Sequence, residues 1–127
     1  MGSILCIDDE PHVANLRCMA LEAAGHAATP CWTIADAKFL LTRREFEVLV
    51  VGAQAGAEWP AICRKLKRAR RPPIVIVTSY RSDDEPPEEQ CADIYFEKTI
   101  DPEHLVSVID EMLRVRDSSV VFNGSMP

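Results

Sequence analysis

Short apolar runs alternate along this chain with longer segments in which apolar residues recur at helical spacing. Five of these runs are candidate strands, and the weakest candidate is the second. The predicted strands are residues 3–7, 26–31, 46–51, 74–77 and 93–97. The predicted helices are residues 11–24, 33–42 and 59–69, with a last helix from residue 102. Strict alternation of strand and helix predicts an α/β fold, a parallel sheet covered by helices on both faces.

Caps and helix breakers mark the ends of these elements. Pro11 suits the first position of the first helix, an aspartate before it can act as N-cap, and Gly25 ends the helix. Thr33 is the predicted cap of the second helix. Between residues 80 and 92, the pair Pro86-Pro87 lies among acidic residues, which leaves little room for a regular helix. We expect a loop with one short or irregular fourth helix there.

Length and composition are those of one folded domain. A chain of 127 residues can bury one core, and 47% hydrophobic with 27% charged residues is far from a disordered composition. We expect the domain to span residues 1–115, and residues 116–127 to form a flexible tail because helical patterning stops there. No apolar run reaches the roughly 18 residues of a membrane span, and no secretory signal is visible. A cytoplasmic location without a membrane partner is therefore expected.

Charge argues against nucleic acid as a partner. The formal net charge is -6 and the pI is near 5.0, so most of the surface repels phosphate. One basic run, residues 64–71, is better explained as a solvated helix face than as a nucleic-acid footprint. The five cysteines are widely spaced and form no zinc-binding pattern, so we expect reduced and mostly buried thiols.

Polar residues follow the predicted strands. The first strand ends in Asp8-Asp9, the third in Gly52, the fourth in Thr78-Ser79 and the fifth in Lys98. Ligands bind at the carboxyl ends of the strands in open parallel sheets, so these positions are expected to surround one crevice. Two carboxylates in one pocket need compensation, which Mg²⁺ or the ammonium of Lys98 can supply.

These residues also have structural explanations. Asp8 or Asp9 can cap the first helix, and Thr78 can be an ordinary polar residue at the end of a strand. No nucleophile with a neighbouring base is visible, because the three histidines fall on helix or strand positions away from the crevice residues. An enzyme is therefore not expected.

Four motifs in register resemble the receiver domains of two-component response regulators, the CheY-like family. They are Ile7-Asp8-Asp9-Glu10-Pro11, Arg44-Glu45-Phe46 before the third strand, Ile76-Val77-Thr78-Ser79, and Ala92-Asp93-Ile94-Tyr95-Phe96-Glu97-Lys98. The resemblance covers residues 3 to 114. It implies a flavodoxin-like, doubly wound parallel sheet of about five strands in the order 2-1-3-4-5.

The resemblance also implies roles for the crevice residues. Asp8 and Asp9 would form the acidic pocket that holds Mg²⁺. Thr78 and Lys98 would contact a phosphoryl group, and Tyr95 would be the aromatic residue that changes rotamer on switching. The family's usual partners are signalling kinases and output proteins, so a protein partner is expected.

The sequence departs from the family pattern where phosphate would be accepted. Gly52 occupies the position of the phosphoaccepting aspartate, and no phosphoaspartate can form on a glycine. Thr99 and Gly56 stand where the family usually has prolines. The altered fourth-helix region matters most, because typical receivers switch and dimerise through that face.

The expected function is that of an atypical receiver, a phosphorylation-independent interaction or regulatory module in a two-component pathway. It would require no cofactor, with at most weak Mg²⁺ binding at Asp8 and Asp9. The alternative is a crevice that still binds Mg²⁺ and an anionic or phosphorylated ligand through Asp8, Asp9, Thr78 and Lys98. The sequence leaves the oligomeric state open.

Overall fold

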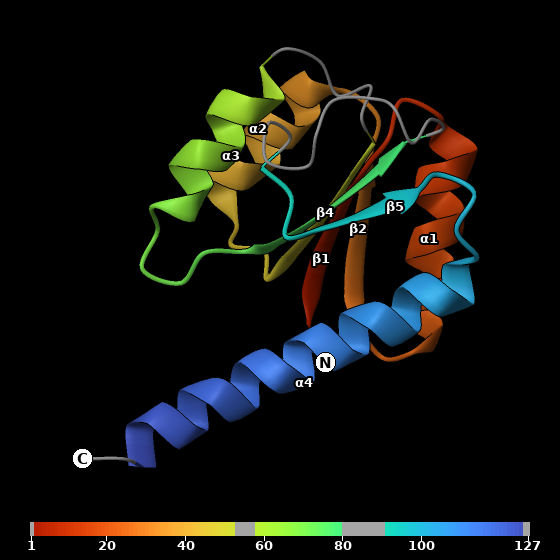
Figure 1. The fold of residues 1–127 in the computed structure, drawn as a ribbon. Helices are drawn as coiled ribbons and strands as arrows, with labels where there is room; N and C mark the ends of the chain where they lie inside the picture. The colour runs from red at the N-terminus through yellow and green to blue at the C-terminus, as the bar shows by residue number, and fades with distance from the viewer. Residues whose placement is uncertain (1, 53–57, 80–90, 126–127) are drawn as a thin grey trace.

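The computed structural model of the chain describes residues 2–52, 58–79 and 91–125, with side chains in the last helix up to residue 117. Figure 1 shows a central sheet with helices on both sides. The strands are β1 (Ser3–Ile7), β2 (Ala27–Cys31), β3 (Val48–Gly52), β4 (Ile74–Ser79) and β5 (Ile94–Glu97). The helices are α1 (Pro11–Ala23), α2 (Ile34–Arg43), α3 (Trp59–Lys67) and α4 (Pro102–Ser125).

The sheet has the order β2-β1-β3-β4-β5, and every neighbouring pair is parallel. Every residue of β3 and β4 is buried, which explains why both strands are continuous apolar runs rather than alternating patterns. The register pairs Ile7 with Val51 and Gly52 with Thr78, so the strands end at one edge. The predicted doubly wound α/β fold is confirmed.

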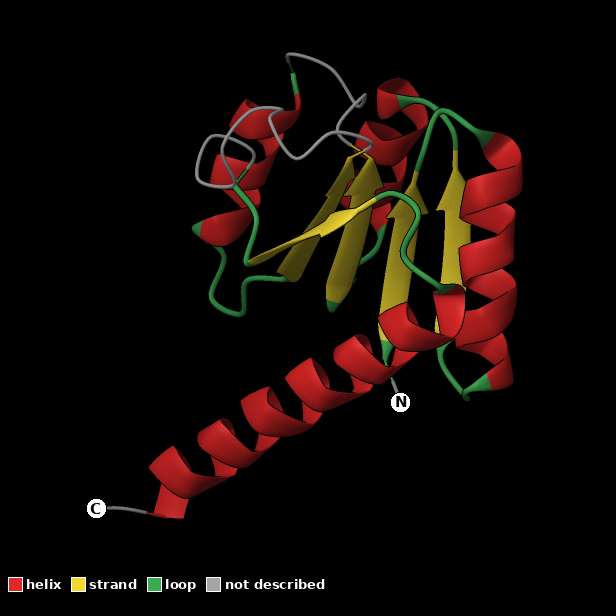
Figure 2. Cartoon of the chain, turned by 45° about the vertical axis from the view of Figure 1, so that its right-hand side comes forward, coloured by secondary structure: helices red, strands yellow, loops and turns green. Residues whose placement is uncertain are grey.

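Two apolar layers hold the helices on the sheet. One layer joins α1 and α4 to the face that carries Ile4, Val48 and Ile76. The other joins α2 and α3 to the face that carries Leu5, Leu49 and Val75. Figure 2 shows the two helix pairs on opposite sides of the strands. Successive strand residues supply both layers because side chains alternate between the faces of a sheet.

The start of α1 differs from the prediction. Its N-cap is Glu10, whose side chain makes no capping hydrogen bond, and neither neighbouring aspartate is the cap. Instead, Asp8 Oδ1 accepts a hydrogen bond of 2.9 Å from the backbone N–H of Glu10. On α1, Leu16 is 53% exposed whereas its neighbour Arg17 is only 3% exposed. A charged side chain thus lies on the buried side of the helix.

The remaining helices largely follow their sequence signals. Thr33 caps α2 and accepts a hydrogen bond of 3.1 Å from the N–H of Asp36, as predicted. Helix α3 ends at Lys67, two residues earlier than expected. Helix α4 continues to Ser125, and Figure 1 shows its second half projecting past the sheet. The domain boundary at residue 115 and the flexible tail stay predictions.

The expectation of reduced cysteines is wrong for one pair. A disulfide joins Cys63, on α3, to Cys91, which precedes β5. The two cysteines are 28 positions apart in the sequence. Cys6, Cys18 and Cys31 are free and buried, as predicted. Spacing could not reveal the pair, because Cys63 and Cys91 are brought together only by the tertiary structure. The expected loop with a short fourth helix (residues 80–90) and the loop position of Gly56 lie outside the described residues.

Within the described ranges, none of the helices combines the length and the apolar character needed to cross a bilayer.

Candidate functional site

The carboxyl edge of the sheet brings several of the predicted crevice residues together. Asp8 follows β1 and Lys98 follows β5, and the Lys98 ammonium lies 2.8 Å from Asp8 Oδ1. Gly52 and Thr78 are register partners at the ends of β3 and β4. Asp9 also belongs to the group, since its Oδ1 lies 3.5 Å from the same ammonium. The structure thus places the acidic pair and the lysine in one ion-pair cluster.

Lys98 is the centre of this cluster. Its Nζ lies 2.5 Å from Glu10 Oε2, in addition to its contacts with the two aspartates, and its side chain is 1% exposed. The backbone fixes the lysine in place, because Lys98 N–H donates to the carbonyl of Ser79 across 2.6 Å. Burial alone would lower the pKa of Lys98, but hydrogen bonds to Asp8 and Glu10 and their charges outweigh it and raise the pKa above its usual value. The lysine is therefore held as a cation.

Asp8 has a second cationic partner that the sequence reasoning missed. Arg17 Nη1 donates to Asp8 Oδ2 across 3.4 Å, and Arg17 Nη2 donates to the Lys98 carbonyl across 3.4 Å. The side chains of Arg17 and Asp8 are 3% and 0% exposed. The one available signal was a charged residue inside the apolar spacing of the first helix. Because burying an unpaired charge is costly, a buried arginine at that position needs a counter-ion from elsewhere in the fold.

The acidic cluster can be tested for its fit to a metal ion. Oxygens of Asp8, Asp9 and Glu10 all lie within 4.8 Å of one another, which suits a divalent cation that prefers carboxylate ligands. The Lys98 ammonium already lies among these three carboxylates, however, and Arg17 holds the other oxygen of Asp8. Mg²⁺ would have to displace the lysine, so the residues fit a protein-supplied cation better than a metal.

A small hollow lies beside this cluster. It has a volume of about 130 Å³ and is lined by residues of the β1, β2 and β3 ends, among them Asp8, Asp9, Gly52 and Trp32. Gly52 contributes no side chain to it, so no nucleophile is present at the position where the resemblance expects one. Trp32, which sequence reasoning did not single out, is 47% exposed and gives this crevice its own fluorophore.

Thr78 and Tyr95 complete the set of predicted residues. Thr78 is fully buried, and no residue in the described ranges forms a hydrogen bond with its Oγ1. Tyr95 is partly buried and packs on the α2 and α3 side of the sheet, near the layer of Val77 and Trp59. It therefore packs away from the last helix, which lies on the other face, and its role as a switch residue stays a prediction.

Solved structures share this fold. A CheY-like receiver domain from Methanospirillum hungatei JF-1 matches with a TM-score of 0.79 and 19% identity, over 91% of this chain and 96% of that chain. The BeF3-activated receiver domain of DrrB matches with a TM-score of 0.73 and 27% identity, over 90% and 98%. An atypical orphan response regulator matches with a TM-score of 0.72 and 21% identity, over 87% and 94%. No family model and no curated protein matches the chain.

The chain has the fold of response-regulator receiver domains. The receiver fold explains why the polar residues gather at one edge, since every strand of a parallel sheet points its carboxyl end there. It does not explain how those residues interact in this chain. In this receiver-like crevice, Arg17 and Lys98 both neutralise Asp8, and Gly52 supplies no acceptor.

Proposed function

We propose that this chain is an atypical receiver domain of a two-component pathway, acting as a phosphorylation-independent interaction or regulatory module and not as an enzyme. The observation that carries the proposal is the pairing of Asp8 with both Arg17 and Lys98 beside Gly52. Two cationic side chains of the chain itself, Arg17 and Lys98, thus compensate the buried carboxylate of Asp8. The domain would then hold one conformation without Mg²⁺ or phosphate.

One comparison adds support. The atypical orphan response regulator with the same fold is described as revealing a phosphorylation-independent regulatory mechanism, which shows that a protein of this fold can regulate without phosphate. Receiver domains are generally signalling modules, so we propose a protein partner, either a kinase or an output protein, in the cytoplasm. Nucleic acid and membrane are not proposed as partners.

Trp32 provides a direct test. The domain is titrated with Mg²⁺ to millimolar concentration, with and without beryllofluoride as a phosphoryl mimic, while tryptophan fluorescence is followed. We expect no saturable change, because the ammonium of Lys98 already occupies the acidic cluster. Trp32→Phe is the control, since it leaves only Trp59, which is 1% exposed, as a reporter. A saturable change that needs both Mg²⁺ and beryllofluoride and is lost in Trp32→Phe contradicts the proposal.

A second candidate is a crevice that binds Mg²⁺ and an anion. It is favoured by the short separations of the Asp8, Asp9 and Glu10 oxygens and by the buried Thr78 hydroxyl, which no described residue engages. In that case Mg²⁺ alone should change the fluorescence of Trp32, and Asp9→Asn should abolish the change. Asp9 suits this test because its side chain is 55% exposed and its substitution leaves the buried pair intact.

A further inference from the structure

The opposite edge of the sheet carries a hollow that the crevice does not explain. It lies where β3 and β4 begin, has a volume of about 480 Å³, and is bordered by α2, α3 and α4. Its floor is apolar, and four arginines and two glutamates surround the floor. The apolar residues are Leu41, Phe46, Leu66, Ala69 and Pro73; the charged ones are Arg44, Arg70, Arg71, Arg116, Glu45 and Glu47.

A second hollow continues this one past Arg116. The two share Pro73 and Arg116, and the second, of about 530 Å³, runs beneath α4 to Met112 and Val115. Val115 is 54% exposed, one of the few large apolar side chains exposed in the described part of the chain. We call the two hollows together the arginine groove. Phe46 and Pro73 are buried, Leu41 and Leu66 are partly buried, and Ala69 is exposed. A hollow with accessible apolar residues and charged residues around them is typical of an interaction surface.

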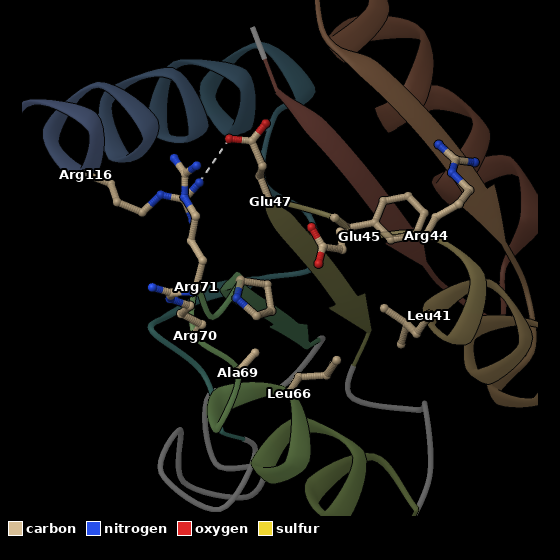
Figure 3. A pocket seen from close by; sticks show the side chains of 11 residues that line it. Leu41, Arg44, Glu45, Glu47, Leu66, Ala69, Arg70, Arg71 and Arg116 are labelled. Atoms are coloured by element: carbon tan, nitrogen blue, oxygen red, sulfur yellow. Dashed lines mark hydrogen bonds and ion pairs between the residues drawn. The ribbon is translucent and has the colours of Figure 1, made fainter. Parts of the chain in front are cut away.

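The arginines of the groove retain capacity for a ligand. Arg70 and Arg71 are exposed, and Arg70 forms no ion pair with any residue in the described ranges. Arg71 pairs with Asp117 across 3.4 Å, but both side chains are more than half exposed, and such pairs contribute little. Figure 3 shows Arg70, Arg71 and Arg116 on one side of the first hollow and Arg44 on the other. A bound chain would therefore meet guanidinium groups on both sides.

Glu47 shows what these arginines bind. Its Oε2 accepts a hydrogen bond of 3.0 Å from Arg116 Nη2, drawn as a dashed line in Figure 3, and its Oε1 accepts one of 3.3 Å from the N–H of Ser3. The groove thus already holds one carboxylate of the chain itself. Arg116 Nε is buried, and no described residue accepts a hydrogen bond from it. Arginine suits carboxylates because its planar donors match the geometry of two oxygens.

We propose that the arginine groove binds a peptide segment of a partner protein in which carboxylates lie beside apolar side chains. The partner carboxylates would pair with Arg70 and Arg71, and its apolar side chains would pack on the accessible apolar residues Leu66, Ala69 and Val115. A nucleic-acid backbone fits less well, because a phosphodiester chain has nothing apolar to place against the apolar residues of the groove. This inference rests on the proposed function and names the face and the partner chemistry for it.

The test uses the full chain and a fluorescein-labelled synthetic peptide that repeats leucine, aspartate and glutamate. We expect saturable anisotropy binding that weakens with salt, and a loss of about tenfold or more in affinity for the double variant Arg70→Glu, Arg71→Glu. The matched control is Arg64→Glu, Lys65→Glu, which makes the same change of charge on exposed residues of α3 outside both hollows. It should change affinity less than about twofold. Glu45→Gln should tighten binding, because it removes a repulsive carboxylate from the groove.

Several results would overturn the inference. They are no binding, an equal loss of affinity in the control variant, equal binding of a peptide with serine in place of leucine, or tighter binding of a single-stranded oligonucleotide. All of these measurements are made without Mg²⁺ or beryllofluoride. Failure here together with a flat response to Mg²⁺ and beryllofluoride would overturn only the docking groove and leave the phosphorylation-independent module standing. Circular dichroism confirms that each variant is folded.

Discussion

Arg17 and Lys98 pair with different oxygens of the Asp8 carboxylate: Arg17 lies 3.4 Å from Oδ2 and Lys98 lies 2.8 Å from Oδ1. The two cations come from opposite ends of the sequence, one from α1 and one from the residue after β5. All three side chains are at most 3% exposed. A buried carboxylate that would otherwise need a metal is thus neutralised by the fold itself.

Removing Arg17 should destabilise the domain strongly. Arg17→Gln leaves Asp8 with one cationic partner in a buried position, and we expect a loss of about 3 kcal/mol in the free energy of unfolding. Urea denaturation measures this loss. The double variant Arg17→Gln, Asp8→Asn should recover part of it, because the two neutral amides need no counter-ion and Lys98 keeps Asp9 and Glu10 as partners. Arg114→Gln, which breaks an exposed ion pair with Glu111, is the control and should leave the unfolding midpoint unchanged. A similar midpoint for Arg17→Gln and the control would contradict a structural role for Arg17.

Lys98 should make stability depend on pH on the alkaline side. Its pKa in the folded state is raised, on balance, by Asp8 and Glu10 against the opposing effect of burial. The native state therefore holds the proton more tightly than the unfolded chain. The stabilisation is complete below the unfolded pKa of about 10.4 and disappears as the pH rises through the higher folded value.

The measurement compares the parent chain with Lys98→Met in urea from neutral to alkaline pH. We expect a difference in unfolding free energy that is constant near neutrality and shrinks above about pH 10. Titration of other groups cancels in this comparison. A difference that stays constant into strong alkali would show that Lys98 is not the cation of the cluster.

The sheet was predictable from sequence for a physical reason. Strands β1, β3 and β4 are buried on both faces, so each is a short, continuous apolar run. This pattern differs from the spaced apolar residues of an amphipathic helix. Parallel pairing then places their last residues at one edge, so the meeting of Asp8 with Lys98 could also be predicted.

The ion-pair partners within the site were harder to predict, because they depend on which face of α1 is buried. Leu16 and Arg17 are neighbours on α1, and sequence spacing admits either on the buried face. Packing against Lys98 and Asp8 buries the arginine and exposes the leucine, which local propensity cannot foresee. The Cys63–Cys91 pair was hidden for the same reason, since its members meet only in the tertiary structure.

The disulfide predicts a stability that depends on reductant. Its 28-residue separation closes a loop around β4, and the chain-entropy model gives about 3 to 4 kcal/mol of stabilisation for such a loop. We expect a thiol reductant to lower the urea midpoint of the parent chain but not that of Cys63→Ser, Cys91→Ser. Equal midpoints for the parent chain with and without reductant would mean that the bond does not form.

Alkylation should separate the two classes of cysteine. Without reductant, Cys63 and Cys91 should not react even after denaturation, because their sulfurs are bonded. Cys31 should react only after denaturation, because burial, with smaller contributions from Asp36 and Cys18, raises the pKa of its thiol to about 12. Mass spectrometry of native and denatured samples reads out each site. Rapid alkylation of native Cys31 would show that the end of β2 is more open than the structure indicates.

Restoring the acceptor tests whether Gly52 alone separates this crevice from a phosphorylatable one. Gly52→Asp would place a carboxylate at the end of β3, opposite Thr78 in the register and near Asp8 and Asp9. We expect the parent chain to take no label from acetyl phosphate, and Gly52→Asp to gain an acyl phosphate in the presence of Mg²⁺. A third carboxylate improves the metal site and shifts the competition with Lys98 toward Mg²⁺.

Gly52→Asn is the matched control for that experiment, since it has the shape of aspartate without its nucleophilic oxygen pair, and it should stay unlabelled. Intact mass spectrometry at neutral pH and after mild alkali detects the labile phosphoryl group. If Gly52→Asp also stays unlabelled at high Mg²⁺, the ion pairs of Lys98 with Asp8 and Glu10 exclude the metal even from a complete acidic site. Adding Glu10→Gln to Gly52→Asp should then restore labelling, because it removes the carboxylate that lies 2.5 Å from the ammonium and frees Lys98 for a phosphoryl oxygen.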